Sequence, residues 1–556
     1  MGRRRGGVLP APRRLVEPVA VAEQEFFRSG AFYGRVALLG AVALSAVAVV
    51  AVRAWSLQVL HRNALLRQSE AQQTRIVELP ASRGIIFDDK MRPLATDGAK
   101  VVVVADPSAL GGGPLTPRWR PSAHGRRVLR RLARLTGVPT WRLVTRIDSS
   151  LAQSPFAPAV VLYRVSQPLA FYLDERARRF PGLHVVVLPI RAYPQGRIGG
   201  AFLGVVGQVS AAQLKERLYA HARPGQLVGQ TGVEAVYDRY LNGGFERARV
   251  RVDARGAIAS PLRLERWQRQ PAALQLTIDS RVQRAAERAL RLGIKLAHAA
   301  GYRDADAGAA VVLEARTGAI KALASAPSVD EAAAANDPRY LQRLVAGRVA
   351  GTPLFNRATQ GLYPAGSTFK PVVAQAALAA HLISPSSELA CTGSLQVGNV
   401  IFHNVEASIN ALLTLPQALA VSCDTWFYRL GEDFYWRQLD GQSLIQNWAR
   451  SLGLGHPTGI DLPAESGGIV PTPRWLRATF PHTPQEQWYE GTSVNLAIGQ
   501  GYLAITPLQL AVAYAALANG GTVVRPHLAR AILRSDGRSR RPLSFPARRR
   551  LRLPDL

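Results

Sequence analysis

The sequence is poor in cysteine, in lysine and in acidic residues. Only two cysteines, Cys391 and Cys423, occur among 556 residues, which excludes a disulfide scaffold, a cysteine-rich zinc module and an iron–sulfur protein. Acidic residues number 38 against 69 basic ones, so the formal net charge is +31. That balance favours contact with an anionic polymer, a lipid surface or nucleic acid, but it does not determine the fold.

Lysine is scarce because arginine takes its place, and only six of the 69 basic residues are lysines. Each retained lysine is therefore a candidate for a role that arginine cannot fill, since arginine keeps its proton in proteins. Apolar residues, in contrast, make up 47% of the chain, which excludes a wholly disordered protein. The length allows roughly three or four domains of about 100–200 residues each.

One long apolar stretch lies near the N-terminus. Residues 36–52 carry no charge, and the apolar character continues to residue 60 with Arg53 as its interruption. Since about 20 apolar residues span a membrane, residues 32–59 are predicted to form a single transmembrane helix after a basic tail at 1–31. A buried soluble helix and a cleaved signal peptide are the alternatives, although the stretch is longer than a signal-peptide core.

Arginines cluster before this stretch. They are Arg3, Arg4, Arg5, Arg13, Arg14, Arg28 and Arg35. By the positive-inside rule they keep the N-terminus cytoplasmic and place everything after residue 60 outside. The remaining basic residues are then interpreted as a solvated, arginine-rich surface, and no zinc-finger or RNA-binding signature indicates a nucleic-acid partner.

The exported part is predicted to hold two α+β domains, one over residues 60–265 and one over residues 270–556. The first is expected to be irregular, with short strands and arginine-rich helices in alternation; the strands are placed at 85–87, 101–105, 160–163 and 184–188, and the helices at 126–136 and 169–179. The second begins with a strand at 274–279, a helix at 280–296 and a hairpin at 309–326. The arginine-rich residues 538–552 are predicted to be a poorly ordered tail.

The sharpest motif is YPAGSTFK at residues 363–370, followed by a run of small apolar residues typical of a buried helix. It places Ser367 at the N-terminus of that helix and Lys370 three residues later on the same face. A serine hydroxyl is a weak nucleophile without a base, and a desolvated lysine amine can serve as one. Ser-x-x-Lys arises often by chance. Taken by itself, the motif is therefore better explained by a serine that caps the helix beside a surface lysine than by a catalytic pair.

A second motif, Ser422–Cys423–Asp424, follows further along and precedes the aromatic residues 426–428. Ser422 can relay a proton between Lys370 and a leaving amine, and Asp424 can steady the lysine charge by hydrogen bonding. Ser-x-Asp alone indicates nothing, but its place after the first motif raises the pair well above chance. Cys391 and Cys423 are predicted to stay unpaired thiols, because a disulfide would strain the motif around Cys423.

With these motifs the chain resembles a class B penicillin-binding protein, a D,D-transpeptidase of peptidoglycan. The resemblance extends from about residue 30 to 530 and rests on further short boxes. They are RGIIFD at 83–88, LA at 94–95, GQTGVE at 229–234, YL at 240–241, VD at 252–253, RG at 255–256, NRA at 356–358, TGIDLP at 458–463, GQG at 499–501 and TPLQ at 506–509. Ser-x-Asp with its aromatic run is more like the elongation-type penicillin-binding protein 2 than the septal type.

The resemblance implies an anchor, a pedestal domain and a transpeptidase domain of serine β-lactamase-like α+β fold. It implies that Ser367 attacks the penultimate D-Ala carbonyl of a stem peptide and that the acyl-enzyme then accepts an amine to form a cross-link. Lys370 is then the base, Ser422 the relay and Asp424 its orienter, with the Ser367 N–H as one oxyanion donor. The predicted substrate-binding residues are Thr368, Cys423 and Asn404. No metal ion and no cofactor is implied.

The predicted location is the bacterial inner membrane, with the bulk of the chain periplasmic. The expected partners are stem peptides, β-lactams, membrane lipid and a membrane glycan polymerase of the shape, elongation, division and sporulation family. No nucleic-acid partner is expected.

The family's third motif, Lys-Thr/Ser-Gly, is not found between the Gly-Gln-Gly box and Leu556. The similar tripeptides at 316–318 and 457–459 both precede that box and lack the lysine. We therefore expect a fragment, an interrupted frame or a degenerate member, and the main alternative function is a non-catalytic scaffold of the wall-synthesis complex. A β-lactam sensor, a penicillin-hydrolysing enzyme and a septal-type transpeptidase are further alternatives. The pedestal boxes argue against the sensor and the hydrolysing enzyme, since neither needs them.

Overall fold

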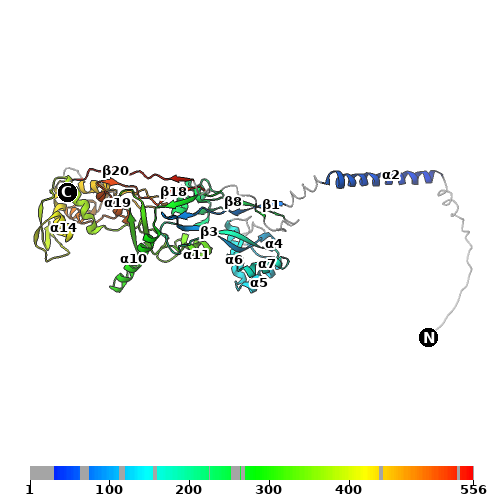
Figure 1. The fold of residues 1–556 in the computed structure, drawn as a ribbon, viewed down its shortest axis with the longest axis horizontal. Coiled ribbons are helices and arrows are strands. Elements are labelled where there is room, and N and C mark those ends of the chain that lie inside the picture. Colours follow the sequence, from blue (N-terminus) through cyan, green and yellow to red (C-terminus); the bar gives the residue numbers. More distant parts are fainter. Residues whose placement is uncertain are drawn as a thin grey trace, which may run out of the picture. The chain divides into compact units, whose positions relative to one another are not determined.

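The computed structural model describes most of the chain. The described residues are 30–62, 74–111, 119–153, 159–163, 165–224, 226–251, 263–264, 270–437, 443–534 and 539–554. They form two compact units, of which the first holds the described residues up to Arg75 together with Arg251, and the second holds the other described residues. Figure 1 shows the elements of both units along the sequence.

The first unit contains the apolar helix. Helix α2 (Gly30–Trp55) continues into a π-helical turn, Ser56–Leu60, and the stretch Tyr33–Leu60 is long and apolar enough to cross a membrane. None of its 18-residue core is buried inside the protein. A helix that is apolar on every side needs an apolar environment, so the bilayer is the surrounding that matches its surface.

The strands and helices of the predicted pedestal follow in the chain, and nearly all of their described residues belong to the second unit. The strands are β1 (Thr74–Pro80), β2 (Ile86–Phe87), β3 (Pro93–Ala105), β4 (Ala159–Leu162), β5 (Leu183–Ala192), β6 (Val206–Gln208), β7 (Leu227–Gly229), β8 (Phe245–Arg251) and β9 (Arg263–Leu264). The helices are α4 (Pro107–Leu110), α5 (Ala123–Thr136), α6 (Thr140–Gln153), α7 (Gln167–Glu175), α8 (Gly232–Val236) and α9 (Asp238–Leu241). Local signals set these boundaries, as in α5, where the Ser122 hydroxyl accepts from the Gly125 N–H and Gly137 ends the helix at φ 69°.

The remaining elements belong to the predicted transpeptidase domain. Its strands are β10 (Ala273–Leu276), β11 (Gly308–Leu313), β12 (Ile320–Ala326), β13 (Glu388–Cys391), β14 (Ser394–Val397), β15 (Val400–His403), β16 (Ala411–Thr414), β17 (Thr522–Val523), β18 (Ala529–Leu533), β19 (Arg540–Pro542) and β20 (Arg549–Arg550). Its helices are α10 (Ser280–Ala299), α11 (Glu331–Asn336), α12 (Pro338–Val345), α13 (Lys370–Ala379), α14 (Leu415–Ala420), α15 (Asp424–Arg437), α16 (Leu444–Ser451), α17 (Pro473–Thr479), α18 (Glu490–Ala497) and α19 (Pro507–Ala518). The predicted α+β class is confirmed.

One sheet is continuous between these two sets of elements. Its seven strands run in the order β19-β18-β10-β2-β3-β4, and β5 also pairs with β3. Strand β10 pairs in parallel with β2 and antiparallel with β18, so Leu274 lies opposite both Ile86 and Ile532. A single hydrophobic cluster unites Ile86 and Phe202 with Leu276 and Leu528. The two predicted domains therefore share backbone hydrogen bonds and apolar burial.

The prediction of a poorly ordered tail over residues 538–552 is wrong for the part that the structure describes. Strand β19 pairs with β18, and β20 pairs with β17. The sequence pattern did not predict these strands because both consist of exposed arginine and proline residues and lack the alternation of apolar and polar residues that indicates a strand. Strand pairing uses backbone N–H and C=O groups, so an existing sheet edge can order a charged segment.

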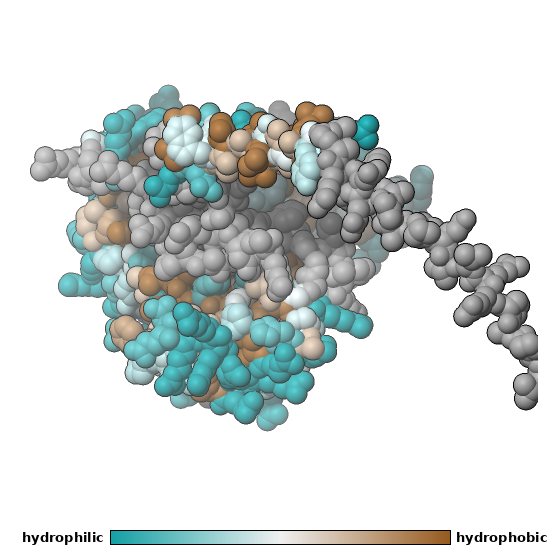
Figure 2. Space-filling view, turned by 90° about the vertical axis from the view of Figure 1, so that its right-hand side faces the viewer, coloured by the Kyte–Doolittle hydropathy of each residue, from teal (hydrophilic) through white to brown (hydrophobic). Residues whose placement is uncertain are grey.

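The arginine-rich surface is confirmed on α5, which buries one apolar stripe. Val128, Leu129 and Leu132 face the core, and the arginines of the helix are exposed. They are Arg126, Arg127, Arg130, Arg131 and Arg134. In the lower part of Figure 2, where Figure 1 places α5, hydrophilic residues form most of the coloured surface. These five arginines therefore form the solvated face of an amphipathic helix.

Glu331 is a buried acid at the start of α11, where this helix packs against β5, and its side chain is 1% exposed. Burial, and to a lesser degree the nearby Glu287 and Asp330, raise the pKa of Glu331 from 4.5 to about 8. The native state then holds a proton that the unfolded state releases, so stability falls as pH rises from about 4.5 to 8. The slope from this group approaches about 1.4 kcal/mol per pH unit.

We therefore expect Glu331→Gln to flatten the dependence of unfolding free energy on pH in this window and to stabilise the protein above it. Denaturant titrations at several pH values measure this. The exposed Glu175 is the matched control, because Glu175→Gln should leave the slope unchanged. An unaltered slope in Glu331→Gln would show that Glu331 is already ionised in the native state.

Candidate active site

The predicted nucleophile lies in a short turn just before a buried helix. Gly366–Phe369 form a 3-10 turn that leads directly into α13 at Lys370. In a 3-10 turn, side chains three residues apart lie on the same side. Ser367 is exposed, whereas Lys370 is 1% exposed and Phe369 is fully buried. The turn thus presents the serine hydroxyl at the surface with the lysine stem below it.

The turn is held from the side by residues of the Gly-Gln-Gly box. The Gly366 N–H donates to the Gly499 carbonyl at 2.9 Å. Gly499 has a φ of 73°, and a Cβ on it would lie 2.2 Å from the Gly366 oxygen, so only glycine fits this approach. Tyr363 and Ile505 exchange backbone hydrogen bonds at 3.0 and 2.9 Å. Two boxes more than 130 residues apart are therefore one packed unit.

Lys370 is surrounded by groups of the second motif. Its Nζ donates to Asp424 Oδ1 at 2.7 Å, to the Ser422 carbonyl at 2.7 Å and to Ser422 Oγ at 3.1 Å. The Phe427 ring lies 5.4 Å away and adds a cation–π contact. An ammonium has three N–H donors, and these three acceptors use all of them.

Ser422 reaches this position through an unusual backbone conformation. It has a φ of 52°, in the left-handed region that residues with a side chain rarely adopt. This residue joins the end of α14 to the start of α15 and turns both its carbonyl and its hydroxyl toward Lys370. Asp424, 4% exposed, is the first residue of α15, where the helix dipole favours a negative charge.

Burial lowers the pKa of Lys370 below its usual value, and the hydrogen bond and charge of Asp424 partly oppose this effect. The neutral amine keeps two N–H groups and gains one lone pair. The two N–H groups can stay on Asp424 Oδ1 and the Ser422 carbonyl, which leaves the lone pair for a hydroxyl proton. The site therefore has the elements of a serine nucleophile with a lysine general base.

The three predicted substrate-binding residues differ in position. Thr368 is exposed beside Ser367, and its hydroxyl donates to the Ala365 carbonyl at 2.5 Å. Asn404 is buried, and both ends of its amide bond to protein groups, with Oδ1 accepting from the Asp424 N–H at 2.9 Å and Nδ2 donating to the Glu406 carbonyl at 3.0 Å. Cys423 is fully buried. Their substrate contacts stay a prediction.

The prediction that both cysteines remain thiols is wrong, because Cys391 and Cys423 form a disulfide. The expected strain does not arise, since their Cα atoms are 6.1 Å apart, within the usual range for a bridged pair. Cys391 ends β13, and Cys423 immediately precedes α15. Both are fully buried, so folding brings two residues 32 positions apart into direct contact.

Two further contributors were missed from the sequence. Phe427 lies three residues after Asp424 on α15, and this helical spacing was the available signal for its contact with Lys370. Thr392 bonds to Thr425, with its N–H donating to Thr425 Oγ1 at 2.9 Å and its carbonyl accepting from the same hydroxyl at 2.8 Å. No periodicity or motif marks Thr392.

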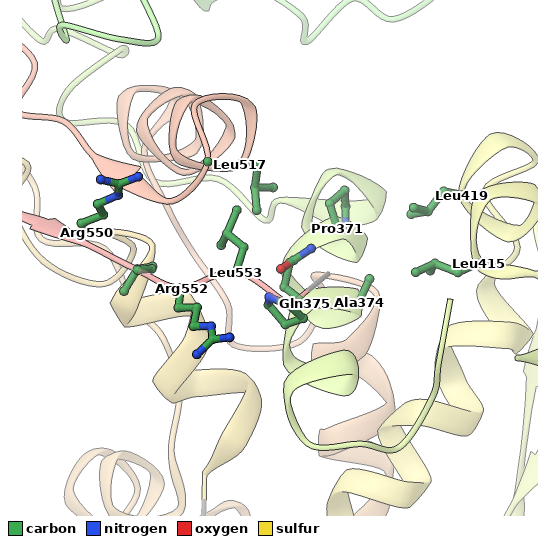
Figure 3. Close-up of a pocket in the computed structure, with 12 residues that line it drawn as sticks. Pro371, Ala374, Gln375, Leu415, Leu419, Leu517, Arg550, Arg552 and Leu553 are labelled. Atoms are coloured by element: carbon green, nitrogen blue, oxygen red, sulfur yellow. The ribbon is translucent and has the colours of Figure 1, made fainter. Parts of the chain in front are cut away.

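A cavity in another part of the described chain is distinct from this site. It has a volume of about 760 Å³ and is lined by α13, α14, α19 and residues 550–554 (Figure 3). Gln375 of α13 faces Leu553 across it, and none of the four predicted catalytic residues lines it. Among the described residues, no three His, Cys, Asp or Glu side chains gather as a metal site.

The lowered pKa of Lys370 has a measurable consequence. With Lys370 in its predicted role as general base, the acylation rate should rise with pH as Lys370 loses its proton, and the rise should be complete below the pH expected of an ordinary lysine. Asp424 raises the pKa of Lys370, so Asp424→Asn should move the rising limb to lower pH while reducing the plateau. Rates of covalent labelling by a fluorescent penicillin across neutral and alkaline pH test this, and a limb displaced to higher pH would contradict it.

Known proteins resemble this chain over nearly its whole length. The family models "Penicillin-binding Protein dimerisation domain" and "Penicillin binding protein transpeptidase domain" match residues 78–269 and 308–545. The peptidoglycan D,D-transpeptidase MrdA of Acinetobacter baumannii is 29% identical over 90% of this chain and 69% of its own length. MrdA of Escherichia coli K12 is 30% identical over 89% of this chain and 73% of its own length.

A solved structure described as "Structural coordination of polymerization and crosslinking by a peptidoglycan synthase complex" contains a chain that is 29% identical. It aligns over 93% of this chain and 82% of that one, with a TM-score of 0.63. Sequence and fold agree on one assignment: the chain belongs to the penicillin-binding protein family of peptidoglycan D,D-transpeptidases.

Proposed function

We propose that Ser367 is the nucleophile with which this chain cross-links peptidoglycan stem peptides during lateral-wall elongation. The observation that carries the proposal is the Lys370 amine, which is buried three residues after an exposed serine and bonded to both Ser422 and Asp424. The elongation role is supported by the Ser-x-Asp motif with its aromatic run and by the likeness to the MrdA proteins.

In the proposed reaction, neutral Lys370 takes the Ser367 proton as Oγ attacks the penultimate D-Ala carbonyl carbon. The Ser367 N–H supports the developing oxyanion. Lys370 then returns the proton through the Ser422 hydroxyl, 3.1 Å away, to the amine of the departing terminal D-Ala. An acceptor amine from a second stem peptide attacks the carbonyl carbon of the resulting ester and loses a proton to Lys370. Lys370 passes this proton to Ser367 Oγ as the C–O bond breaks, which restores the serine hydroxyl and the neutral amine.

Covalent labelling with a fluorescent penicillin tests the nucleophile, since a β-lactam mimics the acyl donor. The adduct should map to the peptide that contains Ser367, and Ser367→Ala should abolish it. Ser386→Ala, at an exposed serine elsewhere in the domain, is the matched control and should label normally. An adduct on Ser422, or labelling that survives Ser367→Ala, would contradict the proposal.

We also propose that α2 anchors the chain with the N-terminus in the cytoplasm and the second unit outside. The arginines before residue 36 support this orientation, and a buried disulfide fits an oxidising compartment. A periplasmic reporter fused after residue 70 should be active, and activity confined to a cytoplasmic reporter would refute the orientation. The likeness to a chain of a polymerizing and crosslinking complex supports a membrane glycan polymerase as partner. Co-purification of such a polymerase with the full chain, compared with a chain that lacks α2, tests this.

A further inference from the structure

Residues 388–414 form a hairpin module between the two catalytic motifs. Strand β13 pairs with β16, and the shorter β14–β15 hairpin lies between them in the sequence. Some of its apolar side chains, such as Leu395 and Phe402, pack against the hydrophobic core, whereas others, such as Val405 and Leu412, are exposed. Its contacts with the rest of the protein concentrate on the first residues of α15.

Nearly every residue from Cys423 to Arg429 bonds to the module. Cys423 is disulfide-bonded to Cys391, the Asp424 N–H donates to Asn404 Oδ1, and Thr425 exchanges two hydrogen bonds with Thr392. Three longer side chains donate to carbonyls of the module. They are Trp426 to Leu413 at 2.9 Å, Arg429 to Ala390 at 3.3 Å and Tyr428 to His403 at 3.4 Å.

These contacts complete the N-terminus of α15. The first N–H groups of a helix have no partner within the helix. Here Asn404 Oδ1 accepts from Asp424, and the Cys423 sulfur accepts from the Trp426 N–H at 3.4 Å. Asn404 also donates to the Cys391 sulfur at 3.6 Å, so the amide and the disulfide form one linked group.

We propose that Asn404 and the Cys391–Cys423 disulfide are positioning elements for catalysis, which act by fixing Asp424 against Lys370. Neither needs to touch substrate. The Lys370 contacts at 2.7 Å to Asp424 and to the Ser422 carbonyl depend on where the α14–α15 junction lies. That junction is held from the module side by one covalent bond and one buried amide. The inference rests on the proposed role of Lys370 as base and extends it to residues outside both motifs.

The test compares Asn404→Ala and the double variant Cys391→Ala/Cys423→Ala with the wild-type chain in acylation by a fluorescent penicillin. Non-covalent binding and the first-order acylation step are separated by varying penicillin concentration. A misplacement of about 1 Å costs ~10²-fold in rate, so we expect the acylation step to slow roughly 10- to 100-fold in both variants. Binding should change less than about twofold, because a positioning residue acts after binding.

Asn410→Ala is the matched control. Asn410 is an exposed asparagine of the same module, and it precedes strand β16. It should acylate at the wild-type rate. In an Asp424→Asn background, Asn404→Ala should cause little further loss, since the group that it positions is already absent.

Each outcome bears on a different claim. If the wild-type chain is not labelled at Ser367, the proposed function fails. If the wild-type chain is labelled and Asn404→Ala acylates equally fast, or loses the same factor in the Asp424→Asn background, the positioning role is wrong. The double cysteine variant gives an independent answer if Asn404→Ala does not fold. Alkylation of both cysteines in the denatured but unreduced protein would overturn the disulfide itself.

Discussion

Lys370→Arg is expected to reduce acylation of Ser367 by ~10²–10⁴-fold, although the positive charge is retained. The substituted guanidinium can still bond to Asp424 and to the Ser422 carbonyl. It cannot accept the Ser367 proton, because arginine stays protonated in proteins. The larger planar group also has to fit a position where the lysine is 1% exposed. The measurement is the second-order rate constant for labelling by a fluorescent penicillin, with folding checked by thermal melting.

Lys321→Arg is the matched control for this substitution. Lys321 is another of the six lysines and lies on β12, 3.7 Å from Asp89, with its side chain partly exposed. An arginine serves equally well in such an ion pair, so labelling should not change. Normal labelling by Lys370→Arg would mean that Lys370 holds the site together electrostatically and that another group takes the proton.

Arg83→Met is expected to destabilise the fold by about 3–5 kcal/mol. Arg83 is buried and donates to Glu234 at 2.5 Å and to Asp238 at 2.6 Å, and both carboxylates are fully buried. Burial alone would raise the pKa of Asp238, but Arg83 and the Gly229 N–H lower it below its usual value. Removing the guanidinium therefore leaves buried negative charge with too little compensation. Denaturant unfolding measures the loss.

Arg197→Met is the control, because Arg197 pairs with Asp330 at 2.5 Å while its own side chain is 80% exposed. An exposed pair contributes about 0–1 kcal/mol, so the variant should unfold near the wild-type midpoint. Adding Asp238→Asn to Arg83→Met should recover part of the lost stability, because Glu234 keeps its ion pair with Arg191 whereas Asp238 loses its arginine partner. Equal effects of the two arginine substitutions would show that the buried network is not a special source of stability.

The local features of this protein followed from the sequence alone. The membrane helix, the helix at α10 and the hairpin of β11 and β12 each have a pattern set by residues within one segment. The same holds for the nucleophile turn, since the spacing of Ser367 and Lys370 depends only on helical geometry. The sequence also predicted that Lys370, Ser422 and Asp424 belong to one site, and the three residues are in contact, while their catalytic roles stay a prediction.

The tertiary structure determined which segments that are distant in the sequence contact one another. The sequence alone left the two cysteines as thiols, because nothing in a chain marks which residues 32 positions apart will lie 6.1 Å apart. It also missed the pairing of the arginine-rich β19 and β20, whose order comes from backbone groups at a neighbouring strand and not from their own side chains. Asn404 and Thr392 matter for the same reason: side chains in a hairpin acquire their role only when folding places them at the start of α15.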